Sequence, residues 1–541
     1  MKLLDFINKE SRIAKNRIVI MSIVSGIANS LLIAIINHAA ETDFGNGVQA
    51  RLFFIYLLAF CLFLYTQKFV LSQSMLAIEE ALRSVRVRIA DKLRRTEFSF
   101  IEQSNRNDLF IRLTQDSSLI SQSMMLLSSA GQAAILIVAS LFYILWISPL
   151  SFLITVGIIG TTAFIYFSHR EKTRQQLQLA RQKENIFFDT LSHLLDGFKE
   201  LKLNRAKRDD LFDDICKTSL EAERIKVEVG NLEVTDWIMA RLCFYTLLPL
   251  LVFVIPAIHG EQSDQIYKIT AAVLFIMGPI SLLIGAIPAL NRVNIALDNF
   301  QSLERDVDKA THRGGDEPIP AWHDFTRLEF KELCFAYYDL QKQPLFSIGP
   351  NSLTLQKGEL LFIVGGNGSG KSTLLKLITG LYYPVSGAVY RDNDLVNDAN
   401  YAGFRELFST VFTDFHLFNR FYGLADIDQS QIAFWLKKME LHEKTHYSPE
   451  GYFTETNLST GQKKRLAFIA AILENKPILI FDELAADQDP DFRRYFYKTV
   501  LPELSRQGKT IIAVTHDDSY FHCADRVLKM DNGLLKPYQA D

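Results

Sequence analysis

Long stretches without a charged side chain constrain this sequence more than any other feature. Residues 117–169 contain no Asp, Glu, Lys or Arg, and neither do residues 18–40 or 269–291. A helix that crosses a bilayer needs about 20 mostly apolar residues, so residues 117–169 suffice for two helices with a turn at ISPLS, residues 147–151. Buried helices of a large water-soluble protein are the alternative, but the ordinary polarity of the second half favours a membrane domain.

Six membrane spans are predicted in the first half of the chain. They cover about residues 18–40, 52–71, 123–147, 149–168, 239–258 and 269–291. The predicted membrane domain is residues 1–304, with long helical extensions that turn near residues 96–110 and 203–214. Gly-Gly and Pro-Ile-Pro mark a linker at residues 305–324, and a second domain is predicted at residues 325–541.

Lysine and arginine are unevenly distributed between the predicted connections. Five of them lie in the first 17 residues, and more follow the second and fourth spans. The connections at residues 37–51 and 259–268 contain few. The positive-inside rule therefore predicts a cytoplasmic N-terminus, and an even number of spans predicts that the second domain is cytoplasmic too.

Composition argues against two other classes of function. The net charge is −3 and the pI about 6.4, so no basic field indicates a nucleic-acid partner. The five cysteines form no CxxC pair, which argues against a disulfide framework or a zinc site.

A glycine-rich loop follows a predicted apolar strand, residues 360–364, and precedes an amphipathic helix. Glycines let backbone N–H groups surround the β- and γ-phosphates of a nucleotide, and the helix N-terminus adds its positive end. Lys371 is expected to bind the phosphate oxygens, and the Ser372 hydroxyl to ligate Mg²⁺. The expected nucleotide-binding residues of this loop are Gly365, Gly366, Asn367, Gly368, Ser369, Gly370, Lys371, Ser372 and Thr373.

Two further apolar strands end in polar side chains. The segment KPILIFDE ends in Asp482, expected in the Mg²⁺ hydration shell, and in Glu483, expected to act as general base for water. The segment KTIIAVTHDD places His516 at the carboxyl end of its strand. Open α/β sheets bind ligands there, so His516 is a candidate for contact with the γ-phosphate.

A second small-residue loop, LSTGQ at residues 458–462, also precedes an amphipathic helix. Ser459, Gly461, Gln462 and the helix N-terminus are expected to form a second phosphate-binding cap. One nucleotide cannot easily use both caps of one rigid domain. Two copies arranged head to tail can do so, which predicts a C2 homodimer that encloses two ATP molecules.

Together these motifs resemble the ATP-binding cassette (ABC) transporter family. Residues 365–372 match its Walker A motif, 458–462 its signature, 478–483 its Walker B motif, Asp489 its D-loop position and His516 its switch histidine. With six predicted spans before the cassette, the chain resembles a type IV exporter half-transporter over essentially its full length. The resemblance implies a membrane all-α domain followed by an α/β P-loop NTPase cassette, a homodimer with twelve spans in the lipid bilayer, and transport coupled to ATP hydrolysis.

Two further positions match the family less closely than these motifs do. In CFAYYD, Tyr337 lies where the family stacks an aromatic ring on adenine and is preferred over Tyr338. The family usually has Gln after a strand near the middle of the cassette, whereas Thr413 occupies that place here. A threonine hydroxyl can still bond a water on Mg²⁺ with a shorter reach, and Asp414 beside it is the alternative.

The segments FTDFHLF and FDELAADQDP resemble a bacterial subgroup that includes the pyoverdine and microcin exporters. This resemblance implies export of a cyclic peptide or peptide siderophore across the bacterial inner membrane. A lipid or drug exporter and a siderophore importer of the same fold are alternatives. A membrane-anchored regulatory ATPase is a further alternative, although six spans exceed what an anchor needs.

Overall fold

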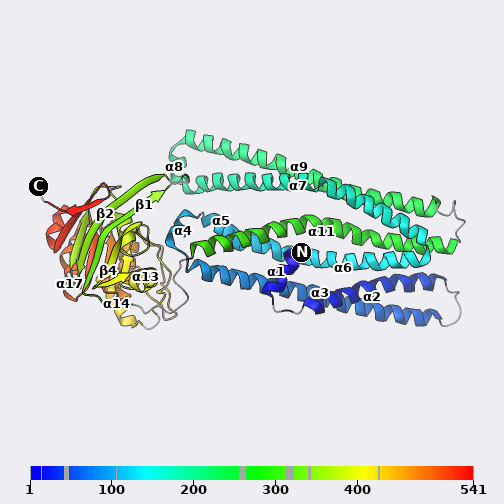
Figure 1. Ribbon diagram of the computed structural model, residues 1–541, viewed down its shortest axis with the longest axis horizontal. Coiled ribbons are helices and arrows are strands. Elements are labelled where there is room, and N and C mark those ends of the chain that lie inside the picture. The colour runs from blue at the N-terminus through cyan, green and yellow to red at the C-terminus, as the bar shows by residue number, and fades with distance from the viewer. Residues whose placement is uncertain are drawn as a thin grey trace. The chain divides into compact units, whose positions relative to one another are not determined.

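The computed structural model describes residues 2–11, 13, 15–41, 48–104, 106–254, 257, 263–311, 322–338, 341, 343–424 and 427–539. The chain divides into two compact units, whose elements are labelled in Figure 1. The helical unit comprises Met1–Lys92 and Arg106–Asp306, and the cassette unit comprises Leu93–Asn105 and Val307–Asp541. Half of the predicted linker, residues 312–321, lies outside the described residues.

The helical unit is built from long helices joined by short turns. Its elements are α1 (Lys2–Glu10), α2 (Lys15–Glu41), α3 (Val48–Leu93), α5 (Arg106–Ile111), the π-helical turn η1 (Arg112–Asp116), α6 (Ser117–Ile147), α7 (Pro149–Asp196), α8 (Phe198–Leu203), α9 (Arg205–Pro249), the π-helical turn η2 (Leu250–Val254) and α11 (Ser263–Ala310). The last residues of α3 and α11 continue into the cassette unit, which also contains the short helix α4 (Phe98–Gln103).

Apolar helices account for the membrane character of this unit. Four of its described helical stretches are long and apolar enough to cross a bilayer: Asn16–Ala39, Ala50–Leu93, Asp108–Ile147 and Ile266–Ala310. Two shorter apolar stretches, Pro149–Phe164 and Phe244–Val254, coincide with the fourth and fifth predicted spans. Large apolar side chains such as Leu58 and Trp146 are exposed on these helices, as expected where lipid covers them. The count of six spans stays a prediction, and part of the fifth predicted span lies beyond the described residues.

The predicted turn at ISPLS separates α6 from α7. The Ser148 hydroxyl caps α7 by accepting a hydrogen bond from the Ser151 backbone N–H at 3.3 Å. Pro149 occupies the first helical turn, where the absent N–H of proline costs no hydrogen bond. The cap and the proline together explain why one uncharged stretch forms two helices.

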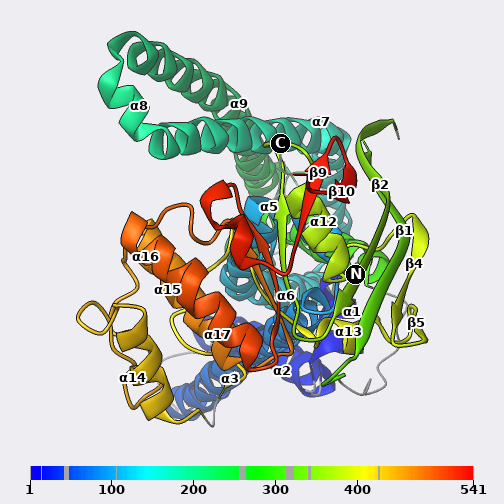
Figure 2. The same ribbon diagram turned by 90° about the vertical axis from the view of Figure 1, so that its left-hand side faces the viewer.

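The extensions α7 and α9 form an antiparallel hairpin with α8 at its tip, as Figure 2 shows. Ion pairs join the two long helices in both directions, with Lys183–Glu221 at 2.6 Å and Lys226–Glu184 at 2.7 Å. The turn comes earlier than the predicted residues 203–214. It lies at α8 because the helix breaks at Gly197 and Asn204 caps α9.

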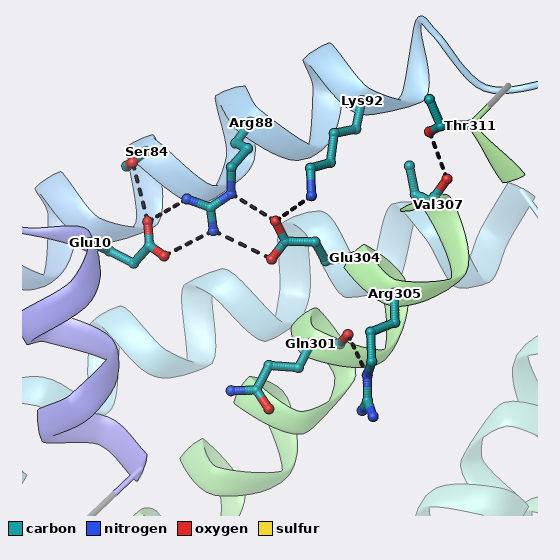
Figure 3. A network of polar contacts seen from close by, with 9 residues as sticks. All are labelled: Glu10, Ser84, Arg88, Lys92, Gln301, Glu304, Arg305, Val307 and Thr311. Atoms are coloured by element: carbon teal, nitrogen blue, oxygen red, sulfur yellow. Dashed lines mark hydrogen bonds and ion pairs between the residues drawn. The ribbon is translucent and has the colours of Figure 1, made fainter. Parts of the chain in front are cut away.

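Arg88 of α3 joins three helices of the helical unit (Figure 3). Its guanidinium donates to both carboxylate oxygens of Glu10 in α1, at 2.5 and 2.9 Å, and to Glu304 in α11 at 2.8 Å. Lys92 also donates to Glu304 at 2.8 Å. The Glu10 side chain is only 5% exposed, and this two-bond contact with Arg88 supplies it with a charged hydrogen-bond donor.

The cassette unit contains two sheets. Its strands are β1 (Arg327–Tyr338), β2 (Pro344–Gln356), β3 (Leu360–Val364), β4 (Ser386–Arg391), β5 (Asp394–Val396), β6 (Phe408–Val411), β7 (Ile478–Asp482), β8 (Thr510–Val514), β9 (Arg526–Asp531) and β10 (Leu534–Pro537). The six-stranded sheet has the order β10-β9-β3-β8-β7-β6 and is parallel except for the edge pair β10–β9. The antiparallel sheet has the order β2-β1-β4-β5.

Helices cover both faces of the six-stranded sheet. The cassette helices are α12 (Lys371–Ile378), α13 (Tyr401–Arg405), α14 (Gln429–Lys438), α15 (Thr460–Leu473), α16 (Pro490–Tyr495), the π-helical turn η3 (Phe496–Val500), α17 (Leu501–Arg506) and the 3-10 turn η4 (Asp518–Cys523). Leu361 and Ile363 of β3 pack in the core with α12, whereas Leu360 and Phe362 pack in the core with α15. Thus α12 and α15 lie on opposite faces of the sheet (Figure 2).

Replacing Arg88 with alanine is expected to lower the free energy of unfolding of the helical unit by about 1–3 kcal/mol, because Glu10 loses its charged donor. Thermal unfolding in lipid nanodiscs measures the effect. Arg305→Ala is the matched control, since the Arg305 guanidinium bonds the Gln301 carbonyl of its own helix at 3.1 Å. Equal losses in Tm for the two variants contradict a special contribution from Arg88.

Candidate nucleotide site

The glycine loop between β3 and α12 adopts a backbone that needs glycine. Gly365, Gly368 and Gly370 have φ angles of 152°, 75° and 102°. A Cβ on Gly365 would lie 2.3 Å from the Met530 carbonyl oxygen, and one on Gly370 would lie 2.8 Å from Ile348. The loop therefore presents its backbone N–H groups in the wrapped form that suits phosphate binding.

Lys371 lies at the centre of this loop. Its ammonium donates to the Gly365 and Gly366 carbonyl oxygens at 2.9 and 3.0 Å. It is also 4.0 Å from the Glu483 carboxylate, and its side chain is only 6% exposed. A buried positive charge held by carbonyl oxygens is well placed to bind the oxygens of a nucleotide.

Ser372 and Asp482 form the expected oxygen pair at the start of α12 and the end of β7. The Ser372 hydroxyl donates to Asp482 Oδ2 at 2.9 Å. Asp482 is 2% exposed, and its other oxygen, Oδ1, is buried with no hydrogen-bond partner among the described residues. Burial raises the pKa of this carboxyl above its usual range. A buried carboxylate oxygen with unused lone pairs beside a hydroxyl fits Mg²⁺, which prefers hard oxygen ligands.

Thr413 is brought to the same place from the end of β6. Its hydroxyl lies 3.5 Å from the backbone carbonyl oxygen of Asp482. Both Thr413 and Asp414 are exposed. The contact places Thr413 next to the residues that fit the metal.

Glu483 and His516 meet at the carboxyl ends of β7 and β8. His516 Nε2 lies 3.0 Å from Glu483 Oε1. The Glu483 backbone has φ of 51°, an unusual value for a residue with a side chain, and its N–H donates to the Val514 carbonyl at 3.2 Å. This backbone turns the carboxylate out of the strand direction and toward the imidazole, where it can accept a proton from water.

The LSTGQ loop has the geometry of a helix cap. The Ser459 hydroxyl accepts from the Gln462 N–H at 3.4 Å, and Gln462 Oε1 accepts from the Ser459 N–H at 3.1 Å. Gly461 packs so closely that a Cβ would lie 2.8 Å from the Asp487 carbonyl oxygen. The cap begins α15, so it lies on the face of the sheet opposite to α12.

Tyr337 and Asp489 occupy two further expected positions. The Tyr337 hydroxyl lies 3.4 Å from the Thr373 hydroxyl and donates to the Tyr382 hydroxyl at 3.1 Å. Tyr338 is 53% exposed. Asp489 caps α16 by accepting from the Phe492 N–H at 2.8 Å.

Sequence reasoning missed two residues beside the site. Lys464 in α15 is buried, and its ammonium donates to the Glu483 carbonyl oxygen at 2.9 Å. Tyr382 is 2% exposed and stacks on Phe335 with ring centroids 4.5 Å apart. Lys464 could have been found as a lysine on the apolar face of an amphipathic helix. No local pattern indicated Tyr382.

Known proteins share this arrangement. The family described as "ABC transporter" matches residues 348–486. ATP-binding protein SyrD of Pseudomonas syringae pv. syringae is 30% identical over 529 residues, which cover 95% of this chain and 92% of SyrD. An ATP-dependent lipid A-core flippase of Pseudomonas aeruginosa is 26% identical over 410 residues, which cover 73% of this chain and 66% of the flippase. The solved structure of a bacterial Atm1-family ABC exporter with ATP bound is similar in fold, with a TM-score of 0.75 and 17% sequence identity. The match covers 96% of this chain and 94% of the exporter chain.

The chain therefore belongs to the ABC transporter family. Its fold is that of a type IV exporter, with a helical transmembrane domain followed by an ATP-binding cassette. The predicted fold class and the predicted hydrolysis of ATP coupled to transport are confirmed. The roles of individual site residues stay predictions.

Glu483→Gln is expected to reduce ATP hydrolysis by about 10²–10⁴-fold, because the amide cannot take a proton from water. ATP binding is expected to persist, since the amide retains the shape of the carboxylate. Phosphate release and equilibrium ATP binding measure the two effects. Glu406→Gln, which removes the carboxylate of a surface ion pair with Lys476, is the control. Sustained turnover by Glu483→Gln contradicts the assignment of the base.

Asp482→Asn is expected to raise the Tm of the nucleotide-free protein at neutral pH. The raised pKa of Asp482 means that the folded state binds its proton more tightly than the unfolded chain does. The ionised carboxyl therefore costs stability. This cost is fully present above the raised pKa and fades as the pH falls through it toward the lower pKa of the unfolded chain.

The same variant is expected to lose much of the Tm increase that Mg²⁺ and ATP give the wild type. Thermal unfolding between about pH 5 and 8, with and without both ligands, measures both effects. Asp531→Asn, at a half-exposed carboxylate, is the control. A lower Tm for Asp482→Asn without nucleotide contradicts the cost assigned to the buried charge.

Proposed function

We propose that the chain works as a homodimer that exports a cyclic peptide or peptide siderophore from the cytoplasm across the bacterial inner membrane. Its N-terminus and cassette lie on the cytoplasmic side. One observation supports the homodimer: the glycine loop at Lys371 and the LSTGQ loop begin helices that lie on opposite faces of one sheet. The substrate class is supported by the resemblance of FTDFHLF and FDELAADQDP to the peptide and siderophore exporters.

The positions of α12 and α15 support the dimer. The cap at Lys371 packs with one core of the cassette, and the cap at Ser459 belongs to the helix that packs in the other core. One nucleotide cannot reach both faces of a sheet within one copy. A head-to-tail pair brings the Ser459 and Gly461 cap of one copy to the Lys371 loop of its partner, twice.

Each copy binds its own nucleotide mainly through the glycine loop. Backbone N–H groups of Gly368, Gly370 and their neighbours and the Lys371 ammonium bind the phosphate oxygens, and Tyr337 stacks on the adenine. Ser372 Oγ and Asp482 would hold Mg²⁺, with Thr413 as an additional oxygen donor. When bound, Mg²⁺ neutralises negative charge on the β- and γ-phosphates.

Hydrolysis depends on Glu483. Its carboxylate accepts a proton from the attacking water, while His516 fixes its orientation through the 3.0 Å contact and reaches the γ-phosphate. Lys371 lies 4.0 Å from the same carboxylate. Asp489 orders the start of α16 beside the cap.

Helix α4 provides a connection between the nucleotide loop and the membrane helices. Its Glu102 carboxylate accepts from the Lys376 ammonium of α12 at 2.7 Å and from the Tyr382 hydroxyl. Because α4 lies between α3 and α5 in the chain, we expect a shift of α12 on ATP binding to act on both through the chain itself. This contact supports alternating access driven by closure of the two cassettes.

The helical unit offers polar groups for a peptide. A cavity of about 360 Å³ is lined by side chains that include Gln115, Ser118, Gln122 and Arg292. The amide nitrogen of Gln132 is buried and has no hydrogen-bond partner among the described residues. Amide and hydroxyl groups within a membrane domain tend to face a cavity or another helix, and they match the backbone groups of a peptide.

A lipid substrate is the second candidate. The flippase relative named above covers 73% of this chain, which supports a lipid as cargo of the same fold. The two candidates differ in which compound stimulates hydrolysis.

ATPase activity in lipid nanodiscs is expected to rise about two- to tenfold when a cyclic peptide siderophore is added, because cargo that binds the closing state better than the open state shifts the population toward cassette closure. Glu483→Gln is the control and is expected to show no stimulated turnover. Uptake of the same compound into inside-out vesicles then tests the direction.

Each outcome points to one candidate. Stimulation by the siderophore with ATP-driven uptake supports the proposal, whereas flux in the opposite direction identifies an importer. Stimulation only by lipids or lipophilic drugs contradicts the peptide substrate. ATP hydrolysis without any vectorial flux contradicts transport and indicates a membrane-anchored regulatory ATPase.

A further inference from the structure

Lys464 is a buried lysine two residues after the LSTGQ loop. It is 4% exposed and lies on the side of α15 that packs toward the sheet. Its ammonium donates to the backbone carbonyl oxygen of Glu483 at 2.9 Å and pairs with Asp487 Oδ2 at 2.7 Å. A buried ammonium is costly unless it is paired, so these two contacts fix its position.

The Glu483 backbone is held from both sides by these contacts. Its N–H donates to the Val514 carbonyl of β8 at 3.2 Å, and its carbonyl accepts from Lys464 of α15. The residue has a φ of 51°, a conformation that persists only where surrounding contacts enforce it. The direction in which the Glu483 carboxylate points therefore depends on the position of α15.

Further contacts join α15 to the segment that follows Glu483. The Gln488 amide donates to the Gly461 carbonyl at 2.9 Å. Arg465 donates to the Gln488 side-chain oxygen at 2.7 Å and to Asp489 at 2.8 Å. Movement of the LSTGQ loop is therefore transmitted to residues 483–489 through side chains of its own helix.

We propose that Lys464 is a positioning residue that aligns the Glu483 carboxylate according to the state of the LSTGQ loop. In the homodimer proposed above, on which this inference rests, that loop contacts the nucleotide of the partner. Glu483 acts on the nucleotide of its own copy. Lys464 thus links the occupancy of one site to the hydrolytic competence of the other.

Lys464→Met tests the link, because methionine fills a similar volume without a donor or a charge. Turnover at saturating ATP is expected to fall about 10- to 100-fold through misalignment of the carboxylate. The KM for ATP and equilibrium ATP binding are expected to change less than about twofold, and the Hill coefficient for ATP to fall toward 1. Steady-state hydrolysis in nanodiscs over a range of ATP concentrations measures the turnover, the KM and the Hill coefficient. Equilibrium ATP binding is measured separately, without hydrolysis.

Lys438→Met is the matched control. Lys438 is also a mostly buried cassette lysine, 14% exposed, and pairs with Glu503 at 2.8 Å on α17, away from Glu483. The Lys438→Met exchange is expected to lower the Tm by about as much as Lys464→Met does, while kcat and the Hill coefficient stay near the wild-type values.

Asp487→Asn keeps the test decisive if Lys464→Met does not fold. The Asp487 side chain is 50% exposed, so the exchange disturbs little packing, and it removes the charge that holds Lys464. It is expected to lower kcat about three- to tenfold at unchanged KM, an intermediate effect, because the bond from Lys464 to the Glu483 carbonyl remains.

A kcat in Lys464→Met and Asp487→Asn equal to that of Lys438→Met overturns the proposal. A raised KM with unchanged kcat also overturns it, since Lys464 then serves binding alone. Failure of the proposed function is distinguishable, because wild-type protein then shows no ATP-driven uptake of the siderophore into inside-out vesicles, whatever the variants do.

Discussion

A parallel sheet buried on both faces leaves charged side chains few places except beyond the carboxyl ends of its strands. The strands β3, β7 and β8 are buried along their full length, and the glycine loop, the Asp482–Glu483 pair and His516 follow them. Asp482 is paired in register with Val514 of the neighbouring strand. The short distance between the Glu483 carboxylate and the His516 imidazole is therefore set by apolar packing several residues away from either group.

Local sequence patterns were sufficient where one segment determines its own conformation. The strand–loop–helix around Lys371 was predicted because glycines, an apolar strand and an amphipathic helix adjoin each other in the chain. The caps at Ser148 and Ser459 follow from the same kind of short-range hydrogen bonding. The separation of the two phosphate caps was also foreseeable, since each cap begins a helix that needs its own apolar face to pack against the sheet.

Long-range contacts were not predictable in this way. Lys464 looked like one of several lysines after LSTGQ until the fold brought the Glu483 carbonyl to it. The predicted membrane domain began at residue 1 without interruption, yet α4 belongs to the cassette unit, where Glu102 meets Lys376 and Tyr382. Such pairings join residues far apart in the chain, and neither composition nor periodicity records them. Thr413 shows a related effect, because its short side chain reaches the Asp482 backbone rather than extending across the site.

The contact between Glu10 and Arg88 also bears on the order in which the protein is made. Helix α1 leaves the ribosome before the residues that hold it: Arg88 follows Glu10 by 78 residues, and Glu304, the other carboxylate on Arg88, lies 216 residues beyond Arg88. At synthesis rates of roughly 5–20 residues per second, α1 exists for several seconds before α3 can hold it and for longer before α11 arrives. Helix α1, which is nine residues long, therefore acquires its final neighbours only after α11 has been synthesised.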